Sequence, residues 1–133
     1  MSITLAPIGI VRTCAADLPR HWSVSDVAGT LVLDEDYREG LRDIEPGQRI
    51  VVLFHFHRSP PFSSERLRQT SGETGQEMGV FSLCSPVRPN PIGLSVLDVV
   101  SVKGAHVDVR GLDMLDGTPI LDIKPYLSAD ERG

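Results

Sequence analysis

The sequence predicts an all-β domain, either a barrel or a sandwich. Ten prolines and twelve glycines interrupt the chain at short intervals, and short β-type runs lie between them. Helical periodicity is weak, and the chain has no internal repeat at a period of 20–50 residues. Many short strands separated by frequent turns are typical of closed or two-layered β architectures. The length of 133 residues fits one domain with one core, covering residues 1–133.

Seven runs have the composition of strands. We expect them at residues 3–13 (broken by Pro7 and Gly9), 29–33, 49–57, 79–83, 92–102, 105–110 and 120–123. The run at 49–57 has the strongest β character, and the run at 92–102 is apolar on both faces, which predicts a central strand. Residues 105–110 alternate between apolar and polar side chains, and Lys103-Gly104 predicts a hairpin turn just before them.

Two short segments favour helical turns. Residues 35–41 and 63–70 could each form one or two turns, so the expected domain is a β structure with one or two short helices. Residues 71–78 contain two glycines and several polar side chains, which predicts a flexible loop.

The composition indicates a protein that does not enter a membrane. No apolar stretch approaches the roughly 20 residues of a membrane-spanning helix, and the N-terminus lacks the pattern of a signal peptide. Cys14 and Cys84 are the only cysteines, too few for a disulfide-rich scaffold. We therefore expect a cytoplasmic protein with two free thiols.

The charge distribution is uneven. The formal net charge is −5, which argues against a generic nucleic-acid coat protein. Acidic residues gather in 34–45, whereas arginines gather at Arg58, Arg66, Arg68 and Arg88. Such clusters usually form solvated faces, but this asymmetry is also compatible with a polyanion that approaches one side.

Two unusual runs contain most of the functional signal. In residues 79–93, three prolines fall within six residues, and each fixes φ and disfavours helix at the residue before it. This predicts a stiff, extended loop that holds Arg88 and Asn90 in a defined place. In residues 113–126, Asp116-Gly117-Thr118-Pro119 has the composition of a turn before a short strand.

Several familiar site patterns are absent from the sequence. It contains no Gly-rich dinucleotide motif after a strand, no P-loop, no G-x-S-x-G elbow and no H-E-x-x-H. His55 and His57 would share one face of a strand and could reach one metal, but a site needs a third ligand. We favour a polar pocket or rim with cofactor contact by His57 and Arg58, and we expect no metal.

Other candidate residues allow two interpretations. Asp122 and Lys124 share one face of the last strand, where they could form a structural ion pair or bind a ligand together. Tyr126 follows a proline and could stack on a base or pack in the core. The Cys84 thiol is more readily interpreted as a small apolar group than as a nucleophile, because no histidine partner is identifiable.

These residues resemble the TsaA-like, or TrmO, family of S-adenosylmethionine-dependent tRNA methyltransferases, also described as YaeB-like. The resemblance extends along nearly the whole chain. It includes Pro7-Ile8-Gly9, Pro19-Arg20-His21, Phe54-His55-Phe56-His57-Arg58, Gly79-Val80-Phe81, Ser85-Pro86, Arg88-Pro89-Asn90-Pro91-Ile92-Gly93-Leu94 and the run from Asp113 to Tyr126.

The resemblance implies a fold, a reaction and a set of site residues. The implied fold is a single-sheeted β-barrel that forms a homodimer. The implied reaction is methylation of the exocyclic amine of threonylcarbamoyladenosine next to the anticodon of tRNA, with S-adenosylmethionine as cofactor. The implied reaction centre is lined by Arg88, Asn90, Asp122, Lys124 and Tyr126. The implied cofactor residues are Pro19, Arg20, His21, His57, Arg58, Cys84, Leu94, Leu115, Asp116, Gly117 and Thr118.

The sequence departs from the family pattern at the cofactor site. Cys84 stands where the family usually has an arginine that contacts the cofactor, and His21 stands where it usually has glutamine. Loss of that arginine removes a charge and a fork of donors. Two alternatives therefore stay open beside the tRNA methyltransferase: a barrel that binds S-adenosylmethionine or a related nucleoside without catalysis, and an enzyme of this class with a small-molecule substrate.

Overall fold

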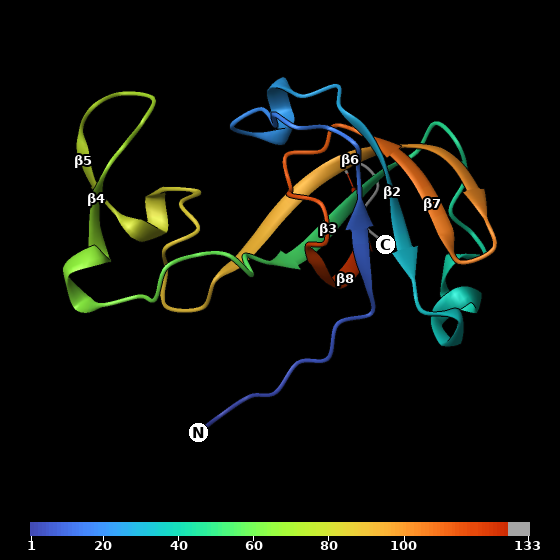
Figure 1. Cartoon of the computed structure of the whole chain (residues 1–133), viewed down its shortest axis with the longest axis horizontal. Helices are drawn as coiled ribbons and strands as arrows, with labels where there is room; N and C mark the ends of the chain where they lie inside the picture. The colour runs from blue at the N-terminus through green and yellow to red at the C-terminus, as the bar shows by residue number, and fades with distance from the viewer. Residues whose placement is uncertain (128–133) are drawn as a thin grey trace.

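Six antiparallel strands close into a barrel in the computed structural model, which describes residues 1–127 (Figure 1). The strand order around the barrel is β1-β2-β7-β6-β3-β8. The strands are β1 (Gly9–Arg12), β2 (Ala28–Leu33), β3 (Arg49–His55), β6 (Ile92–Lys103), β7 (His106–Arg110) and β8 (Pro119–Pro125). This confirms the all-β barrel, and each of these strands lies within or close to a run expected from the sequence.

The interior of the barrel is filled by alternate side chains. Val107 and Val109 of β7 are almost fully buried, and Leu31, Val52, Leu97 and Ile120 from other strands join them. Strand β6 pairs with β3 on one edge and with β7 on the other, as expected of a central strand. Its outward residues Leu94 and Val100 are nevertheless exposed, because a barrel buries only one face of each strand.

The helical segments of residues 1–127 are short 3₁₀ turns. They are η1 (Trp22–Val24), η2 (Glu35–Leu41), η3 (Ser64–Leu67) and η4 (Val80–Ser82). The helical turn expected at 35–41 is present as η2, which closes one end of the barrel with the buried side chain of Leu41. The turn expected at 63–70 ends at Leu67, where a strand begins.

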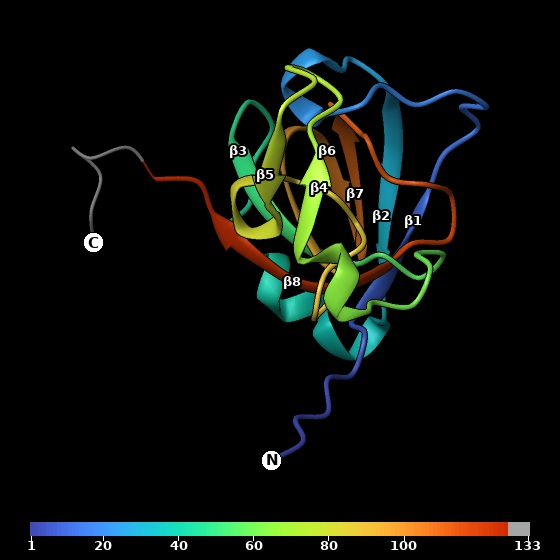
Figure 2. The same cartoon turned by 90° about the vertical axis from the view of Figure 1, so that its left-hand side faces the viewer.

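An arm formed by residues 56–91 leaves the barrel after β3 and returns to it at β6 (Figure 1). It contains a hairpin of β4 (Arg68–Thr70) and β5 (Glu77–Gly79), which is not part of the barrel sheet. Figure 2, with the arm towards the viewer, shows this hairpin in front of the barrel strands.

Two sequence-based expectations in the arm differ from the structure. Residues 71–76 form the expected loop, but Glu77 and Met78 belong to β5, and the Ser71 hydroxyl accepts hydrogen bonds from the N–H groups of Glu73 and Thr74 within the loop. The strand expected at 79–83 was wrong: β5 ends at Gly79, where it pairs only with β4, and Val80–Ser82 form the 3₁₀ turn η4.

Candidate functional site

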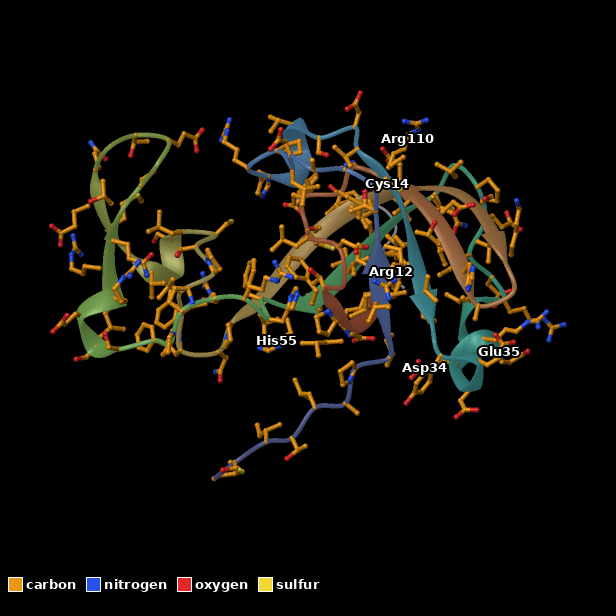
Figure 3. All side chains as sticks on the ribbon, in the orientation of Figure 1. Arg12, Cys14, Asp34, Glu35, His55 and Arg110 are labelled. Atoms are coloured by element: carbon orange, nitrogen blue, oxygen red, sulfur yellow. The ribbon has the colours of Figure 1, made fainter. Side chains whose placement is uncertain are left out.

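Two adjacent cavities lie where the arm joins the barrel. The first has a volume of about 430 Å³ and the second about 270 Å³. Four residues line both cavities and form the wall between them: Phe54, Phe56, Pro86 and Asp113. His55, next to this wall, lies at the arm-side end of β3 (Figure 3). A combined space of this size, with aromatic and polar walls, suits a nucleoside-sized ligand.

The first cavity collects residues from three separate segments. Arg20 and His21 come from the loop before η1, Cys84 and Arg88 come from the proline-rich loop, and Leu94 comes from β6. All five were expected from the sequence at the cofactor site or reaction centre. The structure therefore brings together residues up to 74 positions apart in the chain.

His21 is held in place by its role as a helix cap. Its Nδ1 accepts a hydrogen bond from the backbone N–H of Ser23 at 3.3 Å and lies 2.7 Å from the Ser23 hydroxyl. Its ring lies 5.0 Å from the Trp22 ring, centroid to centroid. These contacts engage Nδ1 and one ring face, so a ligand would meet the imidazole at its other nitrogen.

Arg88 anchors the stiff loop predicted from the three prolines. Its Nη1 donates to the carbonyl oxygens of Leu83 at 2.8 Å, Ser85 at 3.2 Å and Val80 at 3.5 Å. The side chain thus ties η4 to the proline-rich loop that follows it. Because these three bonds use only Nη1 of the guanidinium, its other nitrogens remain the atoms suited to a ligand in the first cavity.

The second cavity contains the remaining basic and turn residues. His57, Arg58, Leu115 and Thr118 line it, and the Thr118 hydroxyl donates to the Leu115 carbonyl at 2.6 Å. Gly117 has φ of +85°, which confirms the predicted tight turn at this position. The turn is thus stabilised by a hydrogen bond between two of its own residues.

Asp116 braces the same turn from outside the two cavities. Its carboxylate accepts a hydrogen bond from the Thr13 N–H at 3.0 Å and lies 3.5 Å from Nη1 of Arg12. These contacts join the turn to the last residue of β1 and to the residue after it. In this arrangement the Asp116 side chain orients the turn.

Asp113 is a cavity residue that sequence reasoning did not single out. It is half-buried, lines both cavities, and accepts a hydrogen bond from the Ser95 hydroxyl at 2.5 Å. Burial raises the pKa of its carboxyl above the ordinary value, while the Ser95 hydrogen bond opposes part of that shift. Its position at the start of the 113–126 motif was visible in the sequence, but its contact with a serine on β6 was not.

Gly93 makes room for the aromatic wall. It pairs with Phe54 across β3 and β6, and a Cβ at this position would overlap the Phe54 ring and lie 2.8 Å from Cζ of Phe56. The two rings therefore fold over the glycine, with their centroids 5.0 Å apart in an edge-to-face arrangement.

A third cavity lies beside β8 and contains two predicted reaction-centre residues. Lys124 and Tyr126 line it together with Arg49 of β3. The Lys124 ammonium lies 3.0 Å from the Asp122 carboxylate, the ion pair that their spacing allowed. The Arg49 guanidinium lies 4.9 Å from the Tyr126 ring centroid and 5.8 Å from that of Trp22, which lines the first cavity. Arg49 thus links the third cavity to the first.

Some predicted residues lie outside these cavities. Pro19 precedes Arg20 and is half-buried, and Asn90 is an exposed residue of the proline-rich loop whose carbonyl accepts from the Ile92 N–H at 2.7 Å. Asp122 reaches the third cavity only through its contact with Lys124. The five predicted reaction-centre residues therefore divide between the proline-rich loop and the segment formed by β8 and Tyr126 just after it.

A comparison with known protein families matches residues 12–131 to the tRNA-methyltransferase O N-terminal domain. The chain belongs to this family. The match includes both functional runs and all eleven predicted cofactor residues.

Individual relatives of the family support the assignment. An S-adenosyl-L-methionine-binding protein of Archaeoglobus fulgidus is 38% identical over 125 residues, which cover 92% of this chain and 88% of that protein. The human tRNA (adenine(37)-N6)-methyltransferase is 32% identical over 130 residues, 92% of this chain but 30% of the human protein. The crystal structure of TrmO from Pseudomonas aeruginosa matches with a TM-score of 0.77 and 33% identity. The match covers 99% of this chain and 61% of the Pseudomonas chain.

The described residues contain neither a metal-type cluster nor a membrane-spanning helix. Among residues 1–127, no three side chains of the His, Cys, Asp and Glu types converge as they would around a metal ion. In the same part of the chain, no helix is long and apolar enough to cross a membrane.

Proposed function

We propose that this protein is an S-adenosylmethionine-dependent methyltransferase that acts on tRNA. The proposed target is the exocyclic amine of threonylcarbamoyladenosine next to the anticodon. The observation that carries the proposal is the pair of cavities at the base of the arm. Eight of the eleven cofactor residues expected from the family line one or the other: Arg20, His21, His57, Arg58, Cys84, Leu94, Leu115 and Thr118.

The residues of these cavities fit the chemical groups of the cofactor. The aromatic rings of Phe54 and Phe56 and the side chain of Leu94 offer apolar surface for a nucleoside, and Arg20 and Arg58 offer guanidinium groups for a carboxylate. When bound, S-adenosylmethionine supplies a methyl group on a sulfonium centre, which a nucleophile attacks in line. The main task of the protein is then to hold the two reactants in register.

The substrate side of the reaction would be served by the third cavity and the proline-rich loop. A threonylcarbamoyl group carries a carboxylate, and two cations could bind it: Arg88, which lines the first cavity, and Lys124, which lines the third. Tyr126 and Trp22 each present an aromatic ring close to Arg49, and such rings suit the stacking of a base. Loss of the amine proton requires an acceptor, and the Asp122 carboxylate beside Lys124 is a candidate.

Two further features belong to the same proposal. A homodimer is supported by the arm, which stands apart from the barrel and exposes the apolar side chains of Phe81 and Leu67 (Figure 1). A cytoplasmic location is supported by Cys14 and Cys84, which are both exposed and unpaired.

One observation favours a second candidate function. Cys84 lines the first cavity in place of the family arginine, so the cavity has one cation fewer than the family pattern. A barrel that binds S-adenosylmethionine or a related nucleoside without methylating tRNA, or that uses a small-molecule substrate, is compatible with this change. The Archaeoglobus fulgidus relative is named only for binding the cofactor.

Calorimetric titration of the purified, ligand-free protein with S-adenosylmethionine tests the cofactor site first. We expect a dissociation constant in the micromolar range, on the order of −8 kcal/mol of binding free energy. The Cys84→Arg variant should bind about three- to tenfold more tightly, because a charged fork of donors is restored in the cavity. The matched control is Cys14→Arg, which adds the same charge at an exposed site outside both cavities and should leave the affinity unchanged.

Methyl transfer is then measured with two tRNA preparations, one with and one without the threonylcarbamoyl group. Transfer only to the modified tRNA supports the proposed reaction. Cofactor binding with no transfer to either tRNA favours the second candidate function. If neither the wild-type protein nor Cys84→Arg binds S-adenosylmethionine, the proposed function is wrong.

A further inference from the structure

The wall between the two arm-base cavities contains an isolated negative charge. Asp113 is the only acidic residue among the described residues that line either cavity, whereas Arg20, His21 and Arg88 line the first, and His57 and Arg58 the second. Because the other charged side chains of the two cavities are basic, this half-buried carboxylate is the group best suited to a positive part of a ligand.

No cation within the described residues neutralises this carboxylate directly. Residues 1–127 contain six side-chain ion pairs, and Asp113 takes part in none of them. Its nearest partner is instead neutral, the hydroxyl of Ser95, whose own side chain is fully buried in β6. A hydroxyl fixes the position of a carboxylate but leaves its charge in place, so the cavity retains a site for a positive group.

The surroundings of Asp113 favour a particular kind of cation. Phe54 and Phe56 line both cavities with Asp113, and their rings meet edge to face with centroids 5.0 Å apart. Aromatic faces attract soft alkylated cations, such as quaternary ammonium groups, more readily than water does. A carboxylate beside two rings therefore suits an alkylated onium group better than a small, strongly hydrated ion.

We propose that Asp113, together with Phe54 and Phe56, binds the sulfonium centre of the methyl donor and thereby discriminates it from the demethylated product. This inference rests on the proposed function, since it concerns the same cofactor. S-adenosylmethionine and S-adenosylhomocysteine share the adenosine and the amino-acid group and differ in the methyl group and its positive charge. The attraction between the carboxylate and the sulfur centre would be lost once methyl transfer removes the positive charge. This loss would favour release of the product.

The raised pKa of Asp113 agrees with this arrangement. Burial disfavours its charged form in the free protein. A cation in the shared space would restore the favourable interaction that the carboxylate lacks. The other titratable or basic side chains that line the two cavities are Arg20, His21, Cys84 and Arg88 in the first and His55, His57 and Arg58 in the second. Asp113 is thus the only carboxylate among the described residues of either cavity that can attract a cation.

The test compares the affinities of S-adenosylmethionine and S-adenosylhomocysteine for wild type and Asp113→Asn by calorimetry. Wild type should bind the charged donor more tightly than the neutral product, and Asp113→Asn should reduce that ratio about tenfold, mainly by weakening the donor. The asparagine keeps the size of the side chain and an oxygen that can accept from Ser95. The matched control is Asp43→Asn, which removes the same charge at an exposed position beyond η2.

One further ligand and one further variant test the assignment more closely. Sinefungin carries an ammonium group in place of the methylated sulfonium and should lose affinity for Asp113→Asn as the donor does. Ser95→Ala removes the hydroxyl that fixes the carboxylate and should reduce the donor-to-product ratio by a smaller factor, about two- to fivefold, without loss of the charge.

The outcomes distinguish this inference from the proposed function. Equal weakening of donor and product by Asp113→Asn would place the carboxylate at the amino group that both share, and would overturn the sulfonium assignment. An unchanged ratio, with the variant folded by circular dichroism, would overturn it as well. If wild type binds neither ligand, the proposed function fails before any variant is made, and the inference fails with it.

Discussion

At the scale of single residues, the main trade-off lies at Asp113. A half-buried carboxylate with a hydroxyl partner and no cation within the described residues is unfavourable for folding, and its raised pKa expresses that cost. Functional sites often retain such groups because a ligand benefits from them. We therefore expect the Asp113 carboxylate, which is proposed to recognise the cofactor, to lower the folding stability of the ligand-free protein.

The stability of Asp113→Asn should show this cost. Because the pKa is higher in the folded state, the folded protein binds more protons there, and stability falls as pH rises from about 3.8 through the folded-state pKa. We expect Asp113→Asn to melt a few degrees above wild type at pH 7, and the gap to shrink towards pH 3, where the carboxyl is protonated in both states.

The difference in melting temperature between wild type and Asp113→Asn reports on Asp113 and not on the other acidic groups. Asp108 has a lowered pKa because the hydroxyls of Ser101 and Thr30 donate to it, so its contribution to stability is lost as pH falls. That contribution is the same in wild type and variant and cancels in the difference between their melting temperatures. A variant that melts below wild type at pH 7 would show that the carboxylate stabilises the fold.

At the scale of secondary-structure elements, the cavity depends on how β3 and β6 pair. Phe54 lies opposite Gly93 in this pairing, and the ring folds across the strand because glycine leaves the space free. The aromatic wall of both cavities is thus a product of strand register, since a slip of one residue would turn Phe54 away from the glycine.

Gly93→Ala should disturb both stability and ligand binding. The new Cβ overlaps the Phe54 ring and presses on Phe56, so we expect a loss of about 1–3 kcal/mol in the free energy of unfolding, from overpacking. Affinity for S-adenosylmethionine should fall at least tenfold because the ring wall moves. The matched control is Gly40→Ala in η2, where a Cβ meets no atom within 4 Å. Chemical denaturation and calorimetry measure the two effects, and equal behaviour of both variants would contradict the argument.

Elements formed by interactions between residues close in the sequence could be predicted, whereas features that depend on distant residues could not. The barrel strands were predicted because alternation and β-branched residues are local signals, as in Val107 and Val109. The β4–β5 hairpin was missed because its strands have three residues each and its turn is closed by one serine hydroxyl. The candidate cofactor residues came from the family motifs. Asp113 escaped notice because its environment depends on Ser95, a neighbour that no sequence pattern identifies.

At the scale of the whole molecule, charge is separated along the longest dimension. The segment 34–45, around η2, contains six carboxylates and two arginines, whereas the segment 58–91, which includes most of the arm, contains four arginines and three glutamates. Asp34 and Glu35 lie on the side of the barrel away from the arm (Figures 1 and 3). Although the net charge of the chain is −5, the end of the molecule that carries the arm is less acidic than the end around η2.

This separation predicts where a tRNA would approach. Arg66→Ala and Arg68→Ala, on the arm, should each weaken tRNA binding several-fold, and each should reduce the slope of log affinity against log salt concentration by up to about 1, as expected when one phosphate contact is lost. The matched controls are Arg38→Ala and Arg42→Ala, which remove the same charge from η2, where each arginine pairs with a glutamate one turn away. Filter binding across a salt series measures both quantities. If the η2 variants weaken binding as much as the arm variants, tRNA does not approach from the arm end, and the weakening reflects net charge alone.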